Sequence, residues 1–288
     1  MLSVVVATKD RAPFLERAIE SLERQAGAPP FELIVVDNGS TDGTADVVRR
    51  ASERLASAYV YEPEPNRGAA RNRGIARASG DVVVFIDDDV WLPGGFLAAH
   101  AAAHADGASR AVSGPIVNVP AYDVQPKPGA ANYSRAFFCT CNVSLPRAAL
   151  LTAGGFDERF HLYGWEDTEL GLRLREAGVG RRFSWDAFLY HIKPPDVDTL
   201  DLAMRRTIEK ARMAARLVRT APSARVRLAT GAYSANLVRG KLVAPRWALP
   251  LYAGIAQSRM PAIASFARGL LLDGLYVDEL GRALDGRS

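Results

Sequence analysis

Cysteine is scarce in this chain, and the spacing of the two that occur limits what they can do. Cys139 and Cys141 are two positions apart in FFCTCNVSL. On a β-strand both side chains would point to the same face, where a disulfide between them would be badly strained. We therefore expect two reduced thiols in the core and a reducing compartment.

Long hydrophobic runs and glycine-rich loops are also lacking. The opening MLSVVVATKDR is too short in apolar residues for a signal peptide, and no stretch reaches the roughly 18 uninterrupted apolar residues of a membrane span. The first apolar run is not followed by GxGxxG or another glycine-rich loop, which argues against a dinucleotide-dependent oxidoreductase and a sugar-phosphate nucleotidyltransferase. With 48% apolar and 24% charged residues, the sequence predicts a globular protein that stays in the cytoplasm.

Acidic residues are few in the last third of the chain. Residues 1–196 carry 21 basic and 25 acidic side chains, whereas residues 197–288 carry 15 and 7. We therefore predict two regions, a domain over 1–196 and a basic helical region over 197–288 whose partner is an anionic surface.

The basic region also contains the apolar stretch WALPLYAGIAQSRMPAIASFARGLLLDGLY, broken by Arg259, Pro261 and Arg268. This pattern favours helices that lie on a bilayer, at the inner face of the membrane, over a span. The alternative is a helical subdomain that packs on the first domain or on a second copy in a homodimer. No nucleic-acid-binding motif is present, so nucleic acid is not expected as a partner.

Strand-like and helix-like patterns alternate four times in the first third of the chain. The predicted strands are 2–7, 31–37, 58–62 and 81–87. The predicted helices are 13–26, 42–56 and 68–78, the second with a cap at Ser40 or Thr41. The alternation predicts an α/β fold with a mostly parallel central sheet, helices on both faces and a ligand site at the carboxyl ends of the strands. Further along, RRFSWDAFLYHI predicts one strand.

Three consecutive aspartates end the most apolar of these strands, DVVVFIDDDV. If the chain stays extended, Asp87 and Asp89 project to one side and Asp88 to the other. Unpaired carboxylates near an apolar interior are costly, so a cation or hydrogen-bond donors should compensate them. We predict a magnesium or manganese site here; an acidic turn that caps a helix is the alternative.

A second acidic site is predicted from GWEDTELGLRLREAG, which fits a helix over about 166–177. At 100° per residue Asp167 falls beside the buried leucines, whereas Glu169, Arg173 and Glu176 fall on the solvent side. An acid on the buried face can act as a general base after partial desolvation, with Glu166 as second candidate. The alternative is an acid that stabilises the first turn of the helix.

Histidine and arginine complete the set of candidates. His191 ends the apolar strand WDAFLYHI and could complete a metal shell, in which imidazole would favour manganese over magnesium. NRGAARNRG places Arg67, Arg71 and Arg73 at the start of a helix, where phosphate is attracted; a solvated basic face is the alternative.

Five blocks over roughly residues 1–195 resemble, in order and spacing, the family 2 glycosyltransferases of the GT-A fold. They are SVVVATKDRAPFLERAIESL, ELIVVDNGSTDGT, NRGAARNRGIARASGDVVVFIDDDV, CNVSLPRAALLTAGGFDERF and GWEDTELGLRL. The resemblance implies the GT-A nucleotide-diphospho-sugar transferase fold, a nucleotide-sugar donor such as a UDP-sugar, a divalent metal on a DxD motif, and inversion at the anomeric carbon. A saccharide or lipid-linked acceptor would follow from it.

The resemblance also implies roles for individual residues. Thr8 and Asp37 would contact the nucleotide and Arg71 the nucleotide or diphosphate. Asp87 and Asp88 would lie on the donor side, with Asp87 near the ribose, while Asp89 and His191 would bind Mn²⁺ or Mg²⁺. Asp167 would be the base, and Trp165 would stack against a sugar.

The first block departs from the family pattern. It reads ATKDR where members often have tyrosine and asparagine after the threonine, so Lys9 and Asp10 receive no role. The alternative to an enzyme is a non-catalytic subunit that binds a nucleotide sugar or holds a partner at the membrane.

Overall fold

The computed structural model describes residues 1–194 and 199–286, which form two compact units. The first unit contains Met1–His161 and Glu166–Pro195, and the second contains Leu162–Trp165 and Asp196–Ser288. The predicted boundary between residues 196 and 197 lies outside the described residues. The short segment 162–165 belongs with the second unit, which the sequence did not predict.

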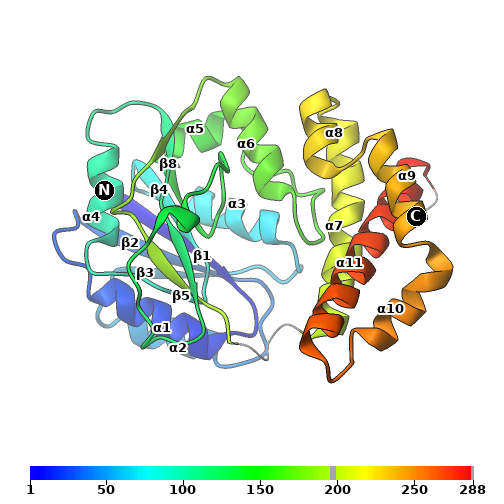
Figure 1. Ribbon diagram of the computed structural model, residues 1–288. Coiled ribbons are helices and arrows are strands. Elements are labelled where there is room, and N and C mark those ends of the chain that lie inside the picture. Colours follow the sequence, from blue (N-terminus) through cyan, green and yellow to red (C-terminus); the bar gives the residue numbers. More distant parts are fainter. Residues whose placement is uncertain (195–198, 287–288) are drawn as a thin grey trace. The chain divides into compact units, whose positions relative to one another are not determined.

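A seven-stranded sheet forms the centre of the first unit, in the order β3-β2-β1-β4-β8-β6-β9 (Figure 1). Its strands are β1 Leu2–Thr8, β2 Phe31–Asp37, β3 Ser57–Tyr61, β4 Val82–Ile86, β6 Arg110–Ser113, β8 Asn142–Pro146 and β9 Gly180–Phe183. Only β8 runs antiparallel to its neighbours β4 and β6, so the sheet is mostly parallel, as predicted. Because β1, β2 and β4 are parallel neighbours, their carboxyl ends meet at one edge.

Helices cover both faces of this sheet. They are α1 Ala12–Glu23, α2 Thr44–Ala51, α3 Arg67–Arg77, α4 Phe96–Ala103, α5 Arg147–Thr152 and α6 Glu166–Glu176. Alternate residues of β1 serve the two cores: Val4 and Val6 pack with α1, α2 and α4, whereas Val5 packs with α3, α5 and α6. The two-residue period of a strand thus accounts for the three-layer arrangement.

The second predicted helix begins later than expected, at Thr44. The expected caps are wrong because both side chains are engaged elsewhere: the Ser40 hydroxyl accepts the N–H of Asp10, and Thr41 donates to the Asp10 carboxylate. Asp42 instead accepts the N–H of Thr44. These contacts tie the loop after β1 to the loop after β2.

A small sheet in the order β5-β10-β7 lies beside the carboxyl end of β4. It contains β5 Val90–Trp91, β7 Ile116–Val119 and β10 Leu189–Ile192. The single strand predicted across RRFSWDAFLYHI is wrong, since β9 and β10 belong to different sheets. Asn142 stabilises the break by donating to the carbonyls of Ala187 and Pro115.

The second unit is helical, as predicted for the carboxyl-terminal region. Its helices are α7 Leu200–Thr220, α8 Ala224–Thr230, α9 Ser234–Val243, α10 Leu249–Ile255 and α11 Pro261–Leu284, with a 3₁₀ turn η2 Arg246–Ala248 before α10 (Figure 1). α7 and α11 pack through small and aliphatic residues, and Arg212 pairs with buried Glu279 at 2.7 Å. Within the part of the chain that the structure describes, no helix combines the length and the apolar character needed to cross a membrane.

Candidate active site

Acidic and hydroxyl side chains meet where β1, β2 and β4 end. Thr8, the last residue of β1, is in register with Asp37, the last residue of β2, and both are buried. The Thr8 hydroxyl donates to Oδ2 of Asp88 over 2.7 Å, just beyond the end of β4. Asp37 accepts the Ser40 N–H and the Tyr59 hydroxyl, each over 2.7 Å. The side chains of Thr8 and Asp37 are therefore buried and held in place by hydrogen bonds at this edge of the sheet.

The chain does not stay extended through the aspartate triplet: it bends at Asp88 and Asp89, so the predicted separation of Asp88 from its neighbours does not hold, and Arg11 contacts both Asp88 and Asp89. Ligand atoms of Asp87, Cys141 and His191 all lie within 4.8 Å of one another, and Oδ1 of Asp89 lies 3.1 Å from Nε2 of His191. Asp88 instead contacts Thr8. His191 thus lies close to the carboxylates of both Asp87 and Asp89.

Arg11 is the cation that compensates the triplet in this structure. Its guanidinium lies 3.3 Å from Oδ1 of Asp88 and 2.8 Å from Oδ2 of Asp89. Burial raises the pKa of Asp88 to about 7, against the opposing effects of Arg11 and Thr8. For Asp89 burial acts in the same direction, but the hydrogen bond and charge of His191 and the charge of Arg11 hold its pKa below the ordinary value.

The groups around His191 fit a divalent cation. Nδ1 of His191 lies 3.0 Å from Oδ1 of Asn118, a partner that can orient the ring so that Nε2 faces the carboxylates. The thiol of Cys141 is buried, and this burial, followed by the charge of Asp87, raises its pKa well above the ordinary value. A neutral thiol is a weak ligand. The remaining set of carboxylate oxygens and one imidazole nitrogen suits manganese or magnesium.

The two cysteines are both free thiols, which confirms the prediction that they form no disulfide. They lie in the turn before β8 and not on a strand as expected. Cys141 thereby comes next to the end of β4, where it packs into the first of the two cores.

Arg71 joins the triplet to helix α6. It is buried on α3, and its guanidinium lies 3.1 Å from Oε1 of Glu166, 3.8 Å from Oδ1 of Asp167 and 3.9 Å from Oδ1 of Asp87. The three arginines predicted at the start of this helix do not act together, since Arg73 pairs with buried Glu62 at 2.9 Å. Arg71 therefore lies among acids from two separate parts of the sequence.

Asp167 is held in an orientation that leaves one oxygen without a hydrogen bond. Oδ2 accepts the N–H of Thr140 over 2.8 Å and its hydroxyl over 3.0 Å. Oδ1 is buried and has no hydrogen-bond partner among the described residues. Burial raises the pKa of Asp167 to about 6, with Glu166 adding to the effect and Arg71 and Thr140 opposing it. A carboxylate with these properties is a suitable general base near neutral pH.

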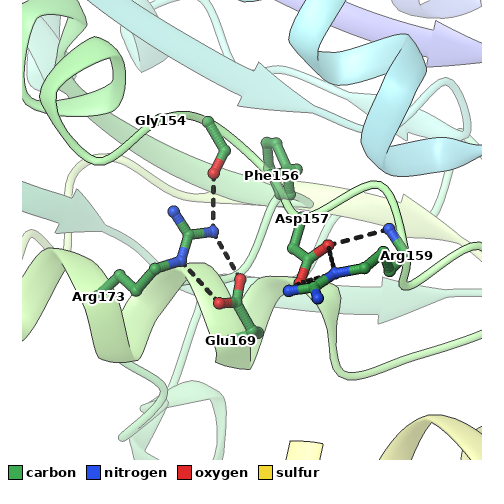
Figure 2. A pocket seen from close by; sticks show the side chains of 7 residues that line it. Gly154, Phe156, Asp157, Arg159, Glu169 and Arg173 are labelled. Carbon is green, nitrogen blue, oxygen red and sulfur yellow. Dashed lines mark hydrogen bonds and ion pairs between the residues drawn. The ribbon is translucent and has the colours of Figure 1, made fainter. Parts of the chain in front are cut away.

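Glu169, two positions after Asp167 on α6, does not face solvent, so that prediction is wrong. It is buried and pairs with Arg173 at 2.6 Å, while Arg173 also donates to the carbonyls of Ala153 and Gly155. A hollow of 240 Å³ beside this pair is lined by Gly154, Gly155, Phe156, Asp157, Arg159, Glu169 and Arg173 (Figure 2). Figure 2 shows Arg173 turned toward Glu169 and Arg159 turned toward Asp157. The bonds of Arg173 to the backbone carbonyls anchor the GGFDER loop to α6.

Trp165 precedes α6 and belongs to the second unit. Its φ of 73° lies in the left-handed region, and the preceding residue, Gly164, also has a positive φ, of 92°. The indole N–H donates to the carbonyl of Lys210 over 3.0 Å, and the Lys210 ammonium lies 5.7 Å from the ring centroid. The role of this ring in stacking against a sugar stays a prediction.

Three residues of the site escaped the sequence analysis. Arg11 lies in the KDR segment that received no role, Thr140 lies between the two cysteines, and Asn118 lies on β7, in register with His191. The residues that they contact are far away in the sequence, so local patterns do not reveal them. Only Arg11 could have been identified, because it is a positive charge close to the end of β1.

Comparisons with known proteins agree with this arrangement. The model described as Glycosyl transferase family 2 matches residues 3–144, and one described as N-terminal domain of galactosyltransferase matches residues 124–193. Validoxylamine A glucosyltransferase of Streptomyces hygroscopicus subsp. limoneus is 31% identical over 248 residues, which cover 71% of this chain and 55% of that protein. The namesake protein of subsp. jinggangensis is also 31% identical, over 71% of this chain and 59% of that protein. The chain thus spans a little over half the length of these relatives.

Solved structures show the same fold. The mannosyltransferase PcManGT of Pyrobaculum calidifontis, in complex with GDP-Man and Mn²⁺, superposes with a TM-score of 0.65 at 24% identity, over 100% of this chain and 88% of that one. Residues 1–349 of TarS from S. aureus, in complex with UDP-GlcNAc, give 0.58 at 18% identity, over 99% and 92%. With a mostly parallel sheet whose acids gather at the ends of β1, β2 and β4, the chain belongs to the family 2 glycosyltransferases and has their GT-A fold.

Proposed function

We propose that this chain transfers a sugar from a nucleoside-diphosphate sugar, a UDP-sugar in the first instance, to a hydroxyl group of a saccharide or lipid-linked acceptor, with inversion. The observation that carries the proposal is the position of Asp167: its Oδ1 has no hydrogen-bond partner among the described residues and lies 3.8 Å from Arg71, whose guanidinium also lies 3.9 Å from Asp87. The relatives named above, a glucosyltransferase and structures that bind GDP-Man or UDP-GlcNAc, support this class of donor.

Asp87, Asp89 and His191 would hold the divalent cation, Mn²⁺ or Mg²⁺. When bound, such an ion would neutralise charge on the diphosphate leaving group. Arg11 would hold Asp88 and Asp89 in place and keep Asp89 ionised. His191 would keep its Nε2 toward the site through its contact with Asn118.

Asp167 would remove the proton from the acceptor hydroxyl at Oδ1 as that oxygen attacks the anomeric carbon. The new bond joins the acceptor oxygen to the anomeric carbon, and the bond from this carbon to the diphosphate oxygen breaks, releasing the nucleoside diphosphate. One base and one displacement suffice, so no second carboxylate nucleophile is needed and the configuration inverts. Thr140 fixes the carboxylate through Oδ2, and Glu166 is engaged by Arg71.

The test is an assay of the purified chain with manganese and three donors, UDP-glucose, UDP-GlcNAc and GDP-mannose, read out as donor hydrolysis and thermal protection. Asp167→Asn should nearly abolish turnover yet retain donor protection. Asp106→Asn, which changes an exposed acid outside the site, is the control. The alternative hypothesis is a non-catalytic nucleotide-sugar-binding or scaffolding subunit. It predicts that a donor protects the wild type thermally but is not turned over, and that result would refute the proposal.

A further inference from the structure

Two helices of the second unit have almost no fully buried residues. α9 buries only Gly240, and α10, LPLYAGI, has no buried residue at all among those described. α7 by contrast buries six residues. Helices α9 and α10 both pack on α11 (Figure 1), yet each leaves large apolar side chains exposed, among them Leu242 and Leu251.

The side chains left exposed are large. Leu242 is 77% exposed, Trp247 80% and Phe266 70%. We define the α8–α11 surface by six exposed residues: Leu228, Leu242, Trp247, Leu251, Met260 and Phe266. Single exposed apolar residues are ordinary, but a group of this size on neighbouring elements indicates an interaction site.

Basic residues are adjacent in the sequence to most of these exposed apolar residues. Four of the six follow directly after a basic residue, in Arg227–Leu228, Lys241–Leu242, Arg246–Trp247 and Arg259–Met260. All four basic residues are exposed. Arg246 pairs with Asp278 at 3.0 Å. Between Glu209 and Asp273 the sequence contains no acidic residue.

The partner must therefore offer hydrocarbon and negative charge together. A second copy of this surface, related by a two-fold axis, would bring cations against cations. Nucleic acid supplies negative charge but no hydrocarbon for Leu242 or Met260. The interface of an anionic bilayer supplies both, and tryptophan is favoured at its headgroup level.

We propose that the α8–α11 surface binds the interface of a membrane rich in anionic phospholipid, with Trp247 and Phe266 inserted and the neighbouring cations at the headgroups. The proposal does not depend on the sugar-transfer chemistry, because every residue it uses lies in the second unit.

The test is co-sedimentation of the full chain with vesicles of phosphatidylcholine alone and of phosphatidylcholine with phosphatidylglycerol. Binding is expected only to the second kind and should weaken as sodium chloride is raised. Lys241→Gln should lower vesicle affinity about fivefold, the effect of one cation near an anionic surface. Trp247→Ala should lower it about tenfold, through lost burial of the ring.

Matched controls come from the first unit. Lys127→Gln removes an exposed cation and Leu151→Ala trims a side chain that is 51% exposed, and neither should change vesicle binding. All substituted positions are exposed, so the fold should survive, which circular dichroism checks. Equal binding to both kinds of vesicle, or none to either, overturns the proposal. Two further outcomes also overturn the proposal when vesicle binding is absent. One is a dimer that Trp247→Ala dissociates, and the other is RNA binding that Lys241→Gln and Trp247→Ala abolish.

Discussion

Replacing Arg11 by Gln tests the electrostatic account of the aspartate triplet. The guanidinium makes two charge-assisted contacts, to Asp88 and Asp89, whose side chains are 7% and 12% exposed. Each such contact contributes about 2 kcal/mol. Because a third of the Arg11 side chain is exposed and solvent screens part of its charge, we expect the free energy of unfolding to fall by about 3 kcal/mol rather than about 4.

A divalent cation should reverse this loss. With Arg11 gone, the carboxylates have more uncompensated charge, so added Mn²⁺ should stabilise Arg11→Gln more than the wild type. A cation present at about 100 times its dissociation constant adds about 2.7 kcal/mol to the folded state. Both effects can be measured by urea unfolding with and without manganese.

The control for this prediction is Arg50→Gln, which breaks an exposed pair with Glu16. That change should cost no more than about 0.5 kcal/mol, because both partners are about half exposed. A loss below about 1 kcal/mol for Arg11→Gln, or equal manganese stabilisation of variant and wild type, would show that Arg11 does not compensate the triplet.

Three further predictions follow from buried ionisable groups. Because Asp167 must be ionised to act as a base and its pKa is raised to about 6, turnover should fall about tenfold per pH unit below 6 in a pH-rate profile; a flat profile down to pH 5 contradicts this role. Glu169→Gln should lower the free energy of unfolding in urea by about 2 kcal/mol, since it breaks a buried ion pair, whereas the exposed Arg49→Gln should change it by less than about 0.5 kcal/mol. Burial lowers the pKa of His100 to about 4, so at this residue the unfolded chain takes up a proton first as the pH falls below 6.5, and His100 by itself lowers the free energy of unfolding by about 2 kcal/mol between pH 7 and pH 5. In urea unfolding, His100→Gln should therefore change in stability between these two pH values about 2 kcal/mol more favourably than the wild type, and an identical change in both contradicts the assignment.

Local periodicity was sufficient for much of the fold. The alternation of apolar runs with helical patterns predicted the parallel sheet and its two helical layers. It also predicted which edge would carry the site, because the carboxyl ends of neighbouring parallel strands must coincide. The helical period placed Asp167 toward the interior, where its Oδ1 is buried. Each of these features depends on residues only a few positions apart.

Features that depend on distant partners could not be predicted in this way. Glu169 has the helical position of a solvent-facing residue, but the GGFDER loop covers it and supplies the carbonyls that its partner Arg173 binds. The stretch RRFSWDAFLYHI has the composition of one strand, but Asn142, some 45 residues away, holds the break between two.

The sequence by itself determined the residue types and their spacing: acids at strand ends, an acid on the inner face of a helix, and a basic carboxyl-terminal region without acids over a long stretch. Only the tertiary structure decided which of these charges meet. Arg11 reaches Asp89 across 78 positions and Arg71 reaches Glu166 across 95, and such pairings arise from the folded path of the backbone. Charge compensation depends on distance in space, and distance in space is set by packing of the whole chain.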